Sequence, residues 1–318
     1  MNIDPLMAAA IAVPDHGRRA SFVQRLARRA ADQPFALCVG IDPSPDALAL
    51  LADAAPLRAG RDGRVARAGA IERFAGLVIE SARDHAVAIK PQIAWFEAAG
   101  VPGMRALERT LEFARTAGLL VILDAKRGDI PHSAAAYAEA WLGDAAGAGA
   151  GADAMTVHAT IGADALLAMA TVAAQRACGL YALLHTSNPG AERIQGALLA
   201  DGRPWWHELA RIVDEVDAAV GPGVVGAVVG ATRPELLTDA RRLLPAAPLL
   251  LPGVGAQGGD VASLRTALAE STPTTPTTLV TASRSLLPAH PAASTPAFRH
   301  AVASAARRLA ADLRTPAA

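Results

Sequence analysis

Four charged side chains stand close together after a short apolar run. The segment VILDAKRGDI, residues 121–130, opens with Val-Ile-Leu and then places Asp124, Lys126, Arg127 and Asp129 within six positions. Side chains of a strand alternate between its two faces, so Asp124 and Lys126 are expected to share a face. A solvated turn would explain one such charge. For charges of both signs at the end of a buried strand, an active site is the other explanation.

Other predicted strands also end in polar residues. Asp42 ends the first strand and Lys90 lies near the end of the second, while Ser187 ends the fifth. A single residue of this kind is commonly a turn former or a helix cap. Because three consecutive strands end in charges, we expect one shared network. The strands are predicted at 35–42, 86–91, 119–126, 153–159, 179–187, 224–231, 248–255 and 277–283.

Amphipathic segments of helical length separate these strands. Residues 103–118 and 133–147 carry apolar side chains at helical spacing. Eight strands alternating with helices over about 250 residues predict a (β/α)8 TIM barrel, an α/β fold. A doubly wound open sheet is the alternative. We predict a single domain over residues 1–318, with a core at about 35–290, an N-terminal helix at about 16–33 and a C-terminal helix at about 294–313.

Two polar segments interrupt this pattern. Residues 55–69 are rich in arginine and glycine, and residues 270–278 are rich in proline and threonine. Both precede a predicted strand. We therefore expect insertions at the amino-terminal end of the barrel, away from the chemistry.

A glycine-rich segment follows the seventh predicted strand. Gly253, Gly255 and Gly258 match the G-x-G-x-x-G spacing of dinucleotide-binding folds. That fingerprint needs the first strand of a βαβ unit and an acidic residue at the end of the next strand, and neither is present. A (β/α)8 barrel instead binds phosphate with the loops after strands 7 and 8. We expect this loop, with Gln257 and Arg284, to bind one phosphate group.

The composition argues against several classes of function. Thirty basic residues balance thirty acidic ones, so no basic surface for nucleic acid or an anionic membrane is expected. No apolar stretch approaches the roughly 18 residues that span a bilayer. Asp4 precedes the short N-terminal apolar run, where a signal peptide needs positive charge. The cysteines, Cys38 and Cys178, have no metal-binding spacing. We expect a cytoplasmic protein without nucleic-acid or membrane partners.

A set of motifs in fixed order carries a resemblance to a known family. Asp124, Lys126, Asp129 and Ile130 fit the signature Asp-x-Lys-x-x-Asp-Ile. The further segments are GIDPSP (40–45), AIKPQIAWFEAAG (88–100), TSNPGA (186–191), VVGATRPELL (228–237), PGVGAQGGD (252–260) and SRS (283–285). The chain resembles the orotidine 5′-phosphate decarboxylases, and their longer bacterial branch best. The resemblance implies decarboxylation of orotidine 5′-phosphate to UMP, the last step of pyrimidine nucleotide synthesis, with no cofactor and no metal.

The resemblance also implies roles for the matching residues. Lys90, Asp124, Lys126 and Asp129 would form the catalytic network, in which Lys126 donates a proton to the carbanion left by carbon dioxide. Asp129 would reach into the site of a second subunit, which implies a homodimer with shared active sites. The implied substrate contacts are Asp42, Ile130, Ser133, Ser187, Gln257, Gly258 and Arg284.

Two other functions remain open from the sequence alone. A magnesium-dependent sugar-phosphate lyase or decarboxylase of the same superfamily shares the Asp-x-Lys-x-x-Asp pattern, but has an acid where this chain has Lys90. A non-catalytic sensor of nucleotide phosphates would keep Gln257 and Arg284, yet has no use for the charged network. The segment TVHATIG (156–162) departs from the family pattern and leaves that wall of the pocket unassigned.

Overall fold

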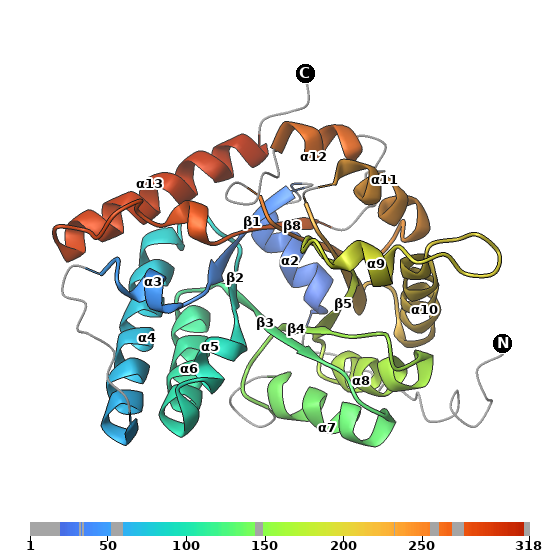
Figure 1. Ribbon diagram of the computed structural model, residues 1–318, viewed down its shortest axis with the longest axis horizontal. Helices are drawn as coiled ribbons and strands as arrows, with labels where there is room; N and C mark the ends of the chain where they lie inside the picture. The colour runs from blue at the N-terminus through green and yellow to red at the C-terminus, as the bar shows by residue number, and fades with distance from the viewer. Residues whose placement is uncertain are drawn as a thin grey trace.

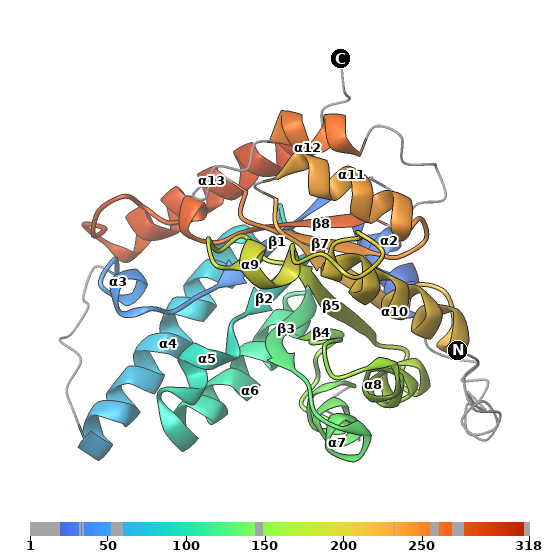
Figure 2. The same cartoon turned by 45° about the vertical axis from the view of Figure 1, so that its right-hand side comes forward.

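The computed structural model describes residues 20–31, 33, 35–51, 60–143, 149–231, 233–254, 261–268 and 277–314. Within them, parallel strands pair in sequence order and close into a barrel. Figures 1 and 2 show this inner ring of strands with helices around it. The strands are β1 (Phe35–Ile41), β2 (Ala88–Pro91), β3 (Leu120–Arg127), β4 (Ala154–Val157), β5 (Gly179–His185), β6 (Val225–Val229), β7 (Leu249–Pro252) and β8 (Thr278–Ala282).

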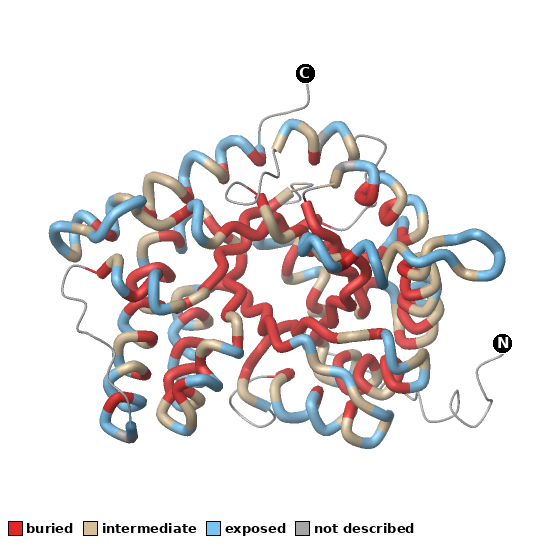
Figure 3. Tube along the Cα trace, viewed as in Figure 1, coloured by how far each residue is buried: buried red, intermediate tan, exposed pale blue. Residues whose placement is uncertain are grey.

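The closure of the sheet decides between the two predicted folds. The first and last strands, β1 and β8, are paired in parallel, with Phe35 opposite Thr278. A doubly wound sheet has two free edges, so that alternative is wrong and the (β/α)8 barrel is confirmed. Each of the eight predicted strands is present within its predicted segment or one residue beyond it. The ring of strands is almost entirely buried in Figure 3, as expected for parallel strands covered by helices.

Helices connect the strands and cover the outside of the barrel. None of the helices in the described ranges is both long and apolar enough to cross a bilayer. Their bounds are α2 (Phe22–Ala30), α3 (Pro45–Leu48), α4 (Gly60–Ala82), α5 (Ile93–Glu97), α6 (Gly100–Thr116), α7 (Pro131–Trp141), α8 (Ala163–Gln175), α9 (Ala191–Gln195), α10 (Trp205–Val220), α11 (Pro234–Leu243), α12 (Val261–Ala267), the short 3₁₀ helix η1 (Arg284–Leu286) and α13 (Thr295–Arg314).

The interpretation of residues 55–69 as an insertion is wrong for the part that the structure describes. Residues 60–69 form the first turns of α4, which continues without a break to Ala82. Ala68, Ile71 and Ala75 are buried and recur at helical spacing, while most of the other residues of these turns are exposed. The polar composition therefore reflects the solvent side of a helix. Of the second predicted insertion, residues 270–276 lie outside the described residues, and Thr278 begins β8.

Helix α2 packs across the end of the barrel where the strands begin. Its start is fixed by a capping box, in which Ser21 and Gln24 each accept the other's backbone N–H. Phe22 and Leu26 are buried against apolar side chains from inside the barrel. The ring of Phe22 meets Tyr181 edge-on, with 5.9 Å between centroids. Apolar packing therefore closes this end of the barrel, and the predicted catalytic residues lie at the other end.

Candidate active site

Asp124 lies at the centre of the predicted charged network. Its carboxylate accepts a hydrogen bond from Lys90 Nζ at Oδ2 and another from Lys126 Nζ at Oδ1, each at 2.5 Å. Lys90 and Asp124 are each 6% exposed, whereas the Lys126 side chain retains 39% of its exposure. The structure thus brings three of the four predicted catalytic residues together, and leaves one ammonium group open to the end of the barrel.

A break in the register of β3 produces this arrangement. Leu123 pairs with Met155 and Arg127 with Val157, so β3 uses four residues where β4 uses two. Lys126 takes up the difference with a left-handed backbone, at φ 49°. Such a conformation is unfavourable for a residue with a Cβ and is found at functional sites. The simple period-two alternation predicted for Asp124 and Lys126 is therefore interrupted, although both side chains still meet.

Two further side chains, Gln92 and Thr156, donate hydrogen bonds to Asp124. The sequence reasoning gave neither of them a role. Gln92 Nε2 donates to Oδ2 at 3.1 Å, and Thr156 Oγ1 donates to Oδ1 at 2.8 Å. Each oxygen of Asp124 thus accepts two hydrogen bonds. A signal for Thr156 was present, because it follows the inward-facing Ala154 by two positions in an apolar strand. Gln92 lies just beyond the strand that carries Lys90, where side chains reach the site.

The protonation states follow from the pairing. Burial alone would raise the pKa of Asp124, but Lys90 and Lys126 hold it well below its ordinary value. Burial would likewise lower the pKa of Lys90, while the charges of Asp124 and Asp42 hold it well above its ordinary value. The Asp124 carboxylate therefore stays negative and Lys90 stays positive at neutral pH.

An apolar layer lies directly beneath these charges. Ala88, Ile122 and Ala154 precede Lys90, Asp124 and Thr156 by two positions and belong to the cluster that packs on α2. Cys38 lies in the same layer, and burial raises the pKa of its thiol to about 12. The thiol is therefore neutral. Since this floor is apolar, the charges can be reached only from the open end of the barrel.

Asp42 lies beside this network at the end of β1. It is half-buried, accepts a hydrogen bond from the Ser283 hydroxyl and contributes to the raised pKa of Lys90. β1 approaches β8 closely here, because a Cβ added to Gly40 would lie 2.8 Å from the Ser283 Cβ. Glycine at position 40 is therefore required for the Asp42–Ser283 contact. Ser283 is a third residue, after Gln92 and Thr156, to which the sequence reasoning gave no role.

Asp129 does not join the lysines within this chain. Its carboxylate accepts the backbone N–H of Ile130 at 2.7 Å, and it forms no ion pair with Lys90 or Lys126 among the described residues. Ile130 is 61% exposed, and Ser133 lies half-buried in the first turn of α7. These three predicted residues therefore stand on the rim of the same barrel end, outside the network.

The remaining predicted contacts are divided between described and undescribed residues. Ser187 follows β5, and Arg284 follows β8 in the short helix η1; both are exposed at the carboxyl ends of their strands. Gln257 and Gly258 lie outside the described residues. The predicted phosphate site is therefore located only through Arg284, and it stays a prediction.

Arg127 and the two strand-end histidines have other surroundings. Arg127 forms an ion pair with Glu97 and lies over the ring of Tyr137, 5.6 Å from its centroid. It links α5 with α7 through these two contacts. The pKa of His158 is lowered by burial and then by Lys126, and the pKa of His185 is lowered by burial and then by Arg233. Both imidazoles are therefore neutral at neutral pH.

Lysine is rare in this chain, and its distribution is a further signal that the sequence reasoning did not use. The sequence contains thirty lysines and arginines in total, and Lys90 and Lys126 are the only lysines among them. An ammonium group can lose a proton to a neighbour, whereas a guanidinium group cannot do so in proteins. The chain thus uses lysine only at the two positions that contact Asp124.

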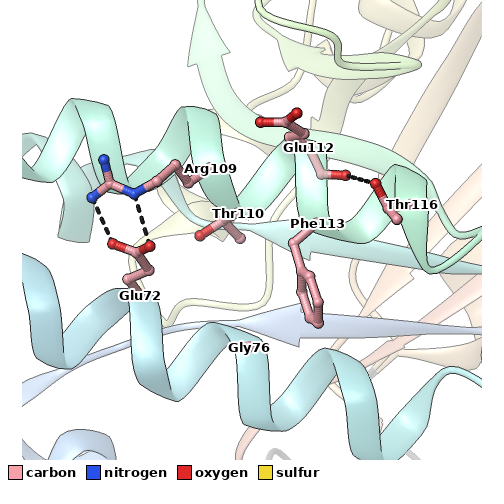
Figure 4. A pocket seen from close by; sticks show the side chains of 7 residues that line it. All are labelled: Glu72, Gly76, Arg109, Thr110, Glu112, Phe113 and Thr116. Carbon is pink, nitrogen blue, oxygen red and sulfur yellow. Dashed lines mark hydrogen bonds and ion pairs between the residues drawn. The ribbon is translucent and has the colours of Figure 1, made fainter.

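A groove elsewhere on the molecule offers no comparable chemistry. It encloses about 470 Å³ between α4 and α6 and is lined by Glu72, Arg109, Thr110 and Phe113, among others (Figure 4). Its one cation among these described lining residues, Arg109, binds both oxygens of Glu72, at 2.7 and 2.5 Å. Arg109 is thus paired with Glu72, and the described lining residues include no lysine or histidine, so the candidate active site is the barrel end.

Fold and site together define a (β/α)8-barrel enzyme with opposed, buried charges at the carboxyl ends of its strands. The model of the orotidine 5′-phosphate decarboxylase / HUMPS family matches residues 36–295, and the chain belongs to this family.

Curated relatives and solved structures agree with this assignment. The chain is 39% identical over 295 residues to the orotidine 5′-phosphate decarboxylase of Salinispora arenicola, covering 92% of this chain and 97% of that protein. It is 39% identical over 245 residues to the enzyme of the same name from Deinococcus radiodurans, covering 77% and 82%. Its fold is similar to that of the Leishmania donovani OMP decarboxylase, with a TM-score of 0.69, 26% identity and coverage of 92% and 97%.

Proposed function

We propose that this chain decarboxylates orotidine 5′-phosphate to UMP, the last step of pyrimidine nucleotide synthesis, without a cofactor. Membership of the decarboxylase family and 39% identity to named decarboxylases support this activity. The observation that carries the mechanism is the buried carboxylate of Asp124 between two ammonium groups, each at 2.5 Å. The relatives give no support to the magnesium-dependent lyase.

The proposed mechanism assigns one task to each charge. The substrate carboxylate lies beside Asp124, which Lys90 and Lys126 keep ionised. When carbon dioxide leaves, its bonding electron pair stays on the ring carbon and the repulsion from Asp124 is relieved. The Lys126 ammonium stabilises this carbanion and transfers a proton to it, after which the lysine regains a proton from water. Atoms and charge balance without an oxidant, a reductant or a second substrate.

The charged network by itself does not supply the whole acceleration. A very slow uncatalysed reaction requires on the order of 20 kcal/mol from its enzyme. One charge pair at about 4 Å contributes roughly 4 kcal/mol at an effective dielectric constant near 20. The remainder must come from binding energy at distant parts of the substrate, used to hold its carboxylate against Asp124.

The residues proposed to supply that binding energy surround the network. Asp42 and Lys90 contact the ribose hydroxyl groups, and Ser187 contacts the pyrimidine. Arg284 binds the phosphate, together with Gln257 and Gly258. Ile130 and Ser133 complete the substrate contacts from the loop after β3 and the start of α7. The half-buried carboxylate of Asp42 beside Lys90 supports the ribose assignment.

The direct test is the loss of orotidine 5′-phosphate, followed by its absorbance, with purified protein in the presence of EDTA and again with Mg²⁺ added. We expect turnover at the same rate in both, with UMP as the product. An enzyme inactive toward this substrate would contradict the proposal. Activity that EDTA abolishes and Mg²⁺ restores would support the lyase instead.

We further propose a homodimer in which Asp129 completes the partner's active site. Asp129 stands at the rim of its own barrel and pairs with neither lysine of the same chain. Ile130 and Ile161 follow adjacent strands and are 61% and 49% exposed. Apolar side chains of this size beside a charged rim suit a surface covered by a second subunit.

Mixing two inactive variants tests this shared site. Lys126→Ala and Asp129→Ala each lack one member of the network, so a hybrid dimer contains one complete site and one doubly impaired site. After the two are unfolded and refolded together, we expect up to about half of the dimers to be hybrids and activity to return in proportion. A mixture as inactive as its components, despite dimers in solution, would contradict a shared site.

We also propose that residues 1–318 form one domain and that the protein works in the cytoplasm. α13 contributes Phe298 and Val302 to the same buried cluster as the strands, which supports one domain. Cys38 and Cys178 are both buried and neither is in a disulfide bond, which suits a reducing compartment.

A further inference from the structure

Thr156 joins the two catalytic groups that the proposed mechanism treats as separate. Its hydroxyl donates to Asp124 Oδ1 at 2.8 Å and accepts the backbone N–H of Lys126 at 3.0 Å. The side chain is 2% exposed and comes from β4, whereas both of its partners belong to β3. A single hydroxyl therefore fixes the carboxylate and the backbone of the proton donor at once.

The register break in β3 explains why this hydroxyl is needed. Between Leu123 and Arg127 the regular pairing with β4 is lost, and Lys126 has φ 49°. A part-buried backbone N–H that loses its ladder partner needs another acceptor, because an unpaired donor is unfavourable away from water. Thr156 Oγ1 is that acceptor, so the same contact stabilises the left-handed backbone that directs Lys126 Nζ toward Asp124.

The chemical requirement at position 156 is narrow. The side chain must accept one hydrogen bond and donate another within the space of a threonine. Valine has the same shape and can do neither, while serine keeps both functions and loses only a methyl group. A substitution series can therefore separate the hydroxyl from the packing.

We propose that Thr156 is a positioning residue for decarboxylation, which holds Asp124 and Lys126 in their reactive arrangement. The inference rests on the roles proposed above for those two residues. Thr156 acts through them, and its hydroxyl is occupied by protein groups. Its loss should therefore slow the chemical step and leave the affinity for the phosphate and ribose unchanged.

Steady-state kinetics of Thr156→Val and Thr156→Ser with orotidine 5′-phosphate test the inference. A displacement of reacting groups by about 1 Å can cost about 100-fold, so we expect kcat of Thr156→Val to fall by about 10- to 100-fold. KM should stay within about twofold, and Thr156→Ser should recover kcat to within about threefold of wild type. Thr110→Val is the matched control, because Thr110 is also buried but its hydroxyl bonds only to Ala106 of its own helix.

The two lysines provide a second readout that a purely structural role would not move. With the ε-nitrogens of lysine labelled with ¹⁵N, NMR should detect one signal for Lys90 and one for Lys126, since the chain has no others. In Thr156→Val we expect the Lys126 signal to shift more than the Lys90 signal, and in Thr110→Val neither should shift. If Thr156→Val does not fold, Thr156→Ala takes its place. Alanine also lacks the hydroxyl, and this variant is measured in the same way.

The outcomes separate this inference from the proposed function. An inactive wild-type protein would overturn the proposed function and the inference with it. An active wild type with an equally active Thr156→Val would overturn the inference alone. A loss confined to KM, or a loss of kcat that serine does not restore, would also overturn it. A fall in kcat at constant KM that serine restores, with a shifted Lys126 signal, would support it.

Discussion

Two buried aspartates on neighbouring strands show how the two ends of this barrel differ. Asp124 lies at the carboxyl end of β3, between Lys90 and Lys126. Asp153 lies just before β4 at the opposite end, where it accepts a hydrogen bond from Arg25 of α2 at 2.6 Å and another from the backbone N–H of Val121 at 2.9 Å. Both carboxylates are paired and almost inaccessible to solvent.

The difference lies in the mobility of the partners. The Val121 N–H belongs to a strand and cannot move, and the Arg25 guanidinium also donates to the carbonyls of Ala20 and Ala177 at 2.9 Å. Asp153 therefore fastens α2 to the barrel. Asp124 is held through side chains alone, and Lys126 retains 39% of its exposure. An ammonium group at the end of a flexible chain can turn to a substrate and release a proton, so the same carboxylate chemistry serves structure at one end and catalysis at the other.

The largest effect is expected from Lys126. Lys126→Ala removes the proposed proton donor, and the loss of a general acid typically costs about 100- to 10,000-fold in rate. Lys126→Arg keeps the positive charge beside Asp124 but cannot deliver the proton, so it should also be severely impaired. Both should remain folded, because the side chain is partly exposed. Single-turnover kinetics with orotidine 5′-phosphate measure the effect, and an arginine variant with wild-type kcat would contradict proton donation by Lys126.

Arg25 should show the opposite pattern. Arg25→Met leaves Asp153 without its cation at a nearly closed site, which should lower the free energy of unfolding by about 3 kcal/mol. The kcat of the folded fraction should not change. Denaturant unfolding and turnover are measured on the same samples, with Arg28→Met, an exposed change on the same helix, as the control. Loss of kcat in a stable Arg25→Met would show that the two ends are not independent.

A smaller effect is expected in the pH dependence of the free energy of unfolding, and it is specific to the charged network around Asp124. The pKa of Asp124 is lowered in the folded state, so its contribution to stability is complete above the unfolded pKa, about 3.9. That contribution is lost as pH falls below this value. The pKa of Lys90 is raised, so its contribution is lost only as pH rises above its unfolded pKa, about 10.4.

Comparison of wild type with Asp124→Asn isolates the carboxylate. The difference in free energy of unfolding should be constant from about pH 6 to 9 and should shrink below about pH 4, by about 1.4 kcal/mol for each unit by which the folded pKa is lowered. Urea unfolding at several pH values measures it. A difference that stays constant down to pH 3 would show that Asp124 is not held ionised by its lysines.

Much of the fold and part of the site could be predicted from sequence, for identifiable reasons. Continuous apolar runs such as 119–126 mark parallel strands buried on both faces, so the barrel followed from their number and alternation. Lys90, Asp124 and Lys126 could then be identified because they lie at the ends of those predicted strands. The helical start of α4 was missed, because the arginines and glycines of residues 60–69 conceal a sparse apolar stripe through Ala68 and Ile71.

The parts that could not be predicted depend on geometry that no single segment encodes. The register break between Leu123 and Arg127 arises from pairing with β4, and it alone gives Thr156 two catalytic partners. Ser283 meets Asp42 only because Gly40 lets β1 and β8 approach. Asp129 has a role only if a second subunit supplies the lysines, so its assignment rests on the family resemblance.

The most direct test of the central claim compares the rate of orotidine 5′-phosphate consumption by Asp124→Asn and Asp153→Asn, each normalised to folded protein. The two substitutions are chemically identical and differ only in the end of the barrel that they affect. We predict that Asp124→Asn loses turnover by at least about 100-fold while remaining folded. Asp153→Asn should unfold more easily and retain wild-type turnover in its folded fraction. Turnover retained by Asp124→Asn, or lost equally by both variants, would contradict the division between a catalytic and a structural end.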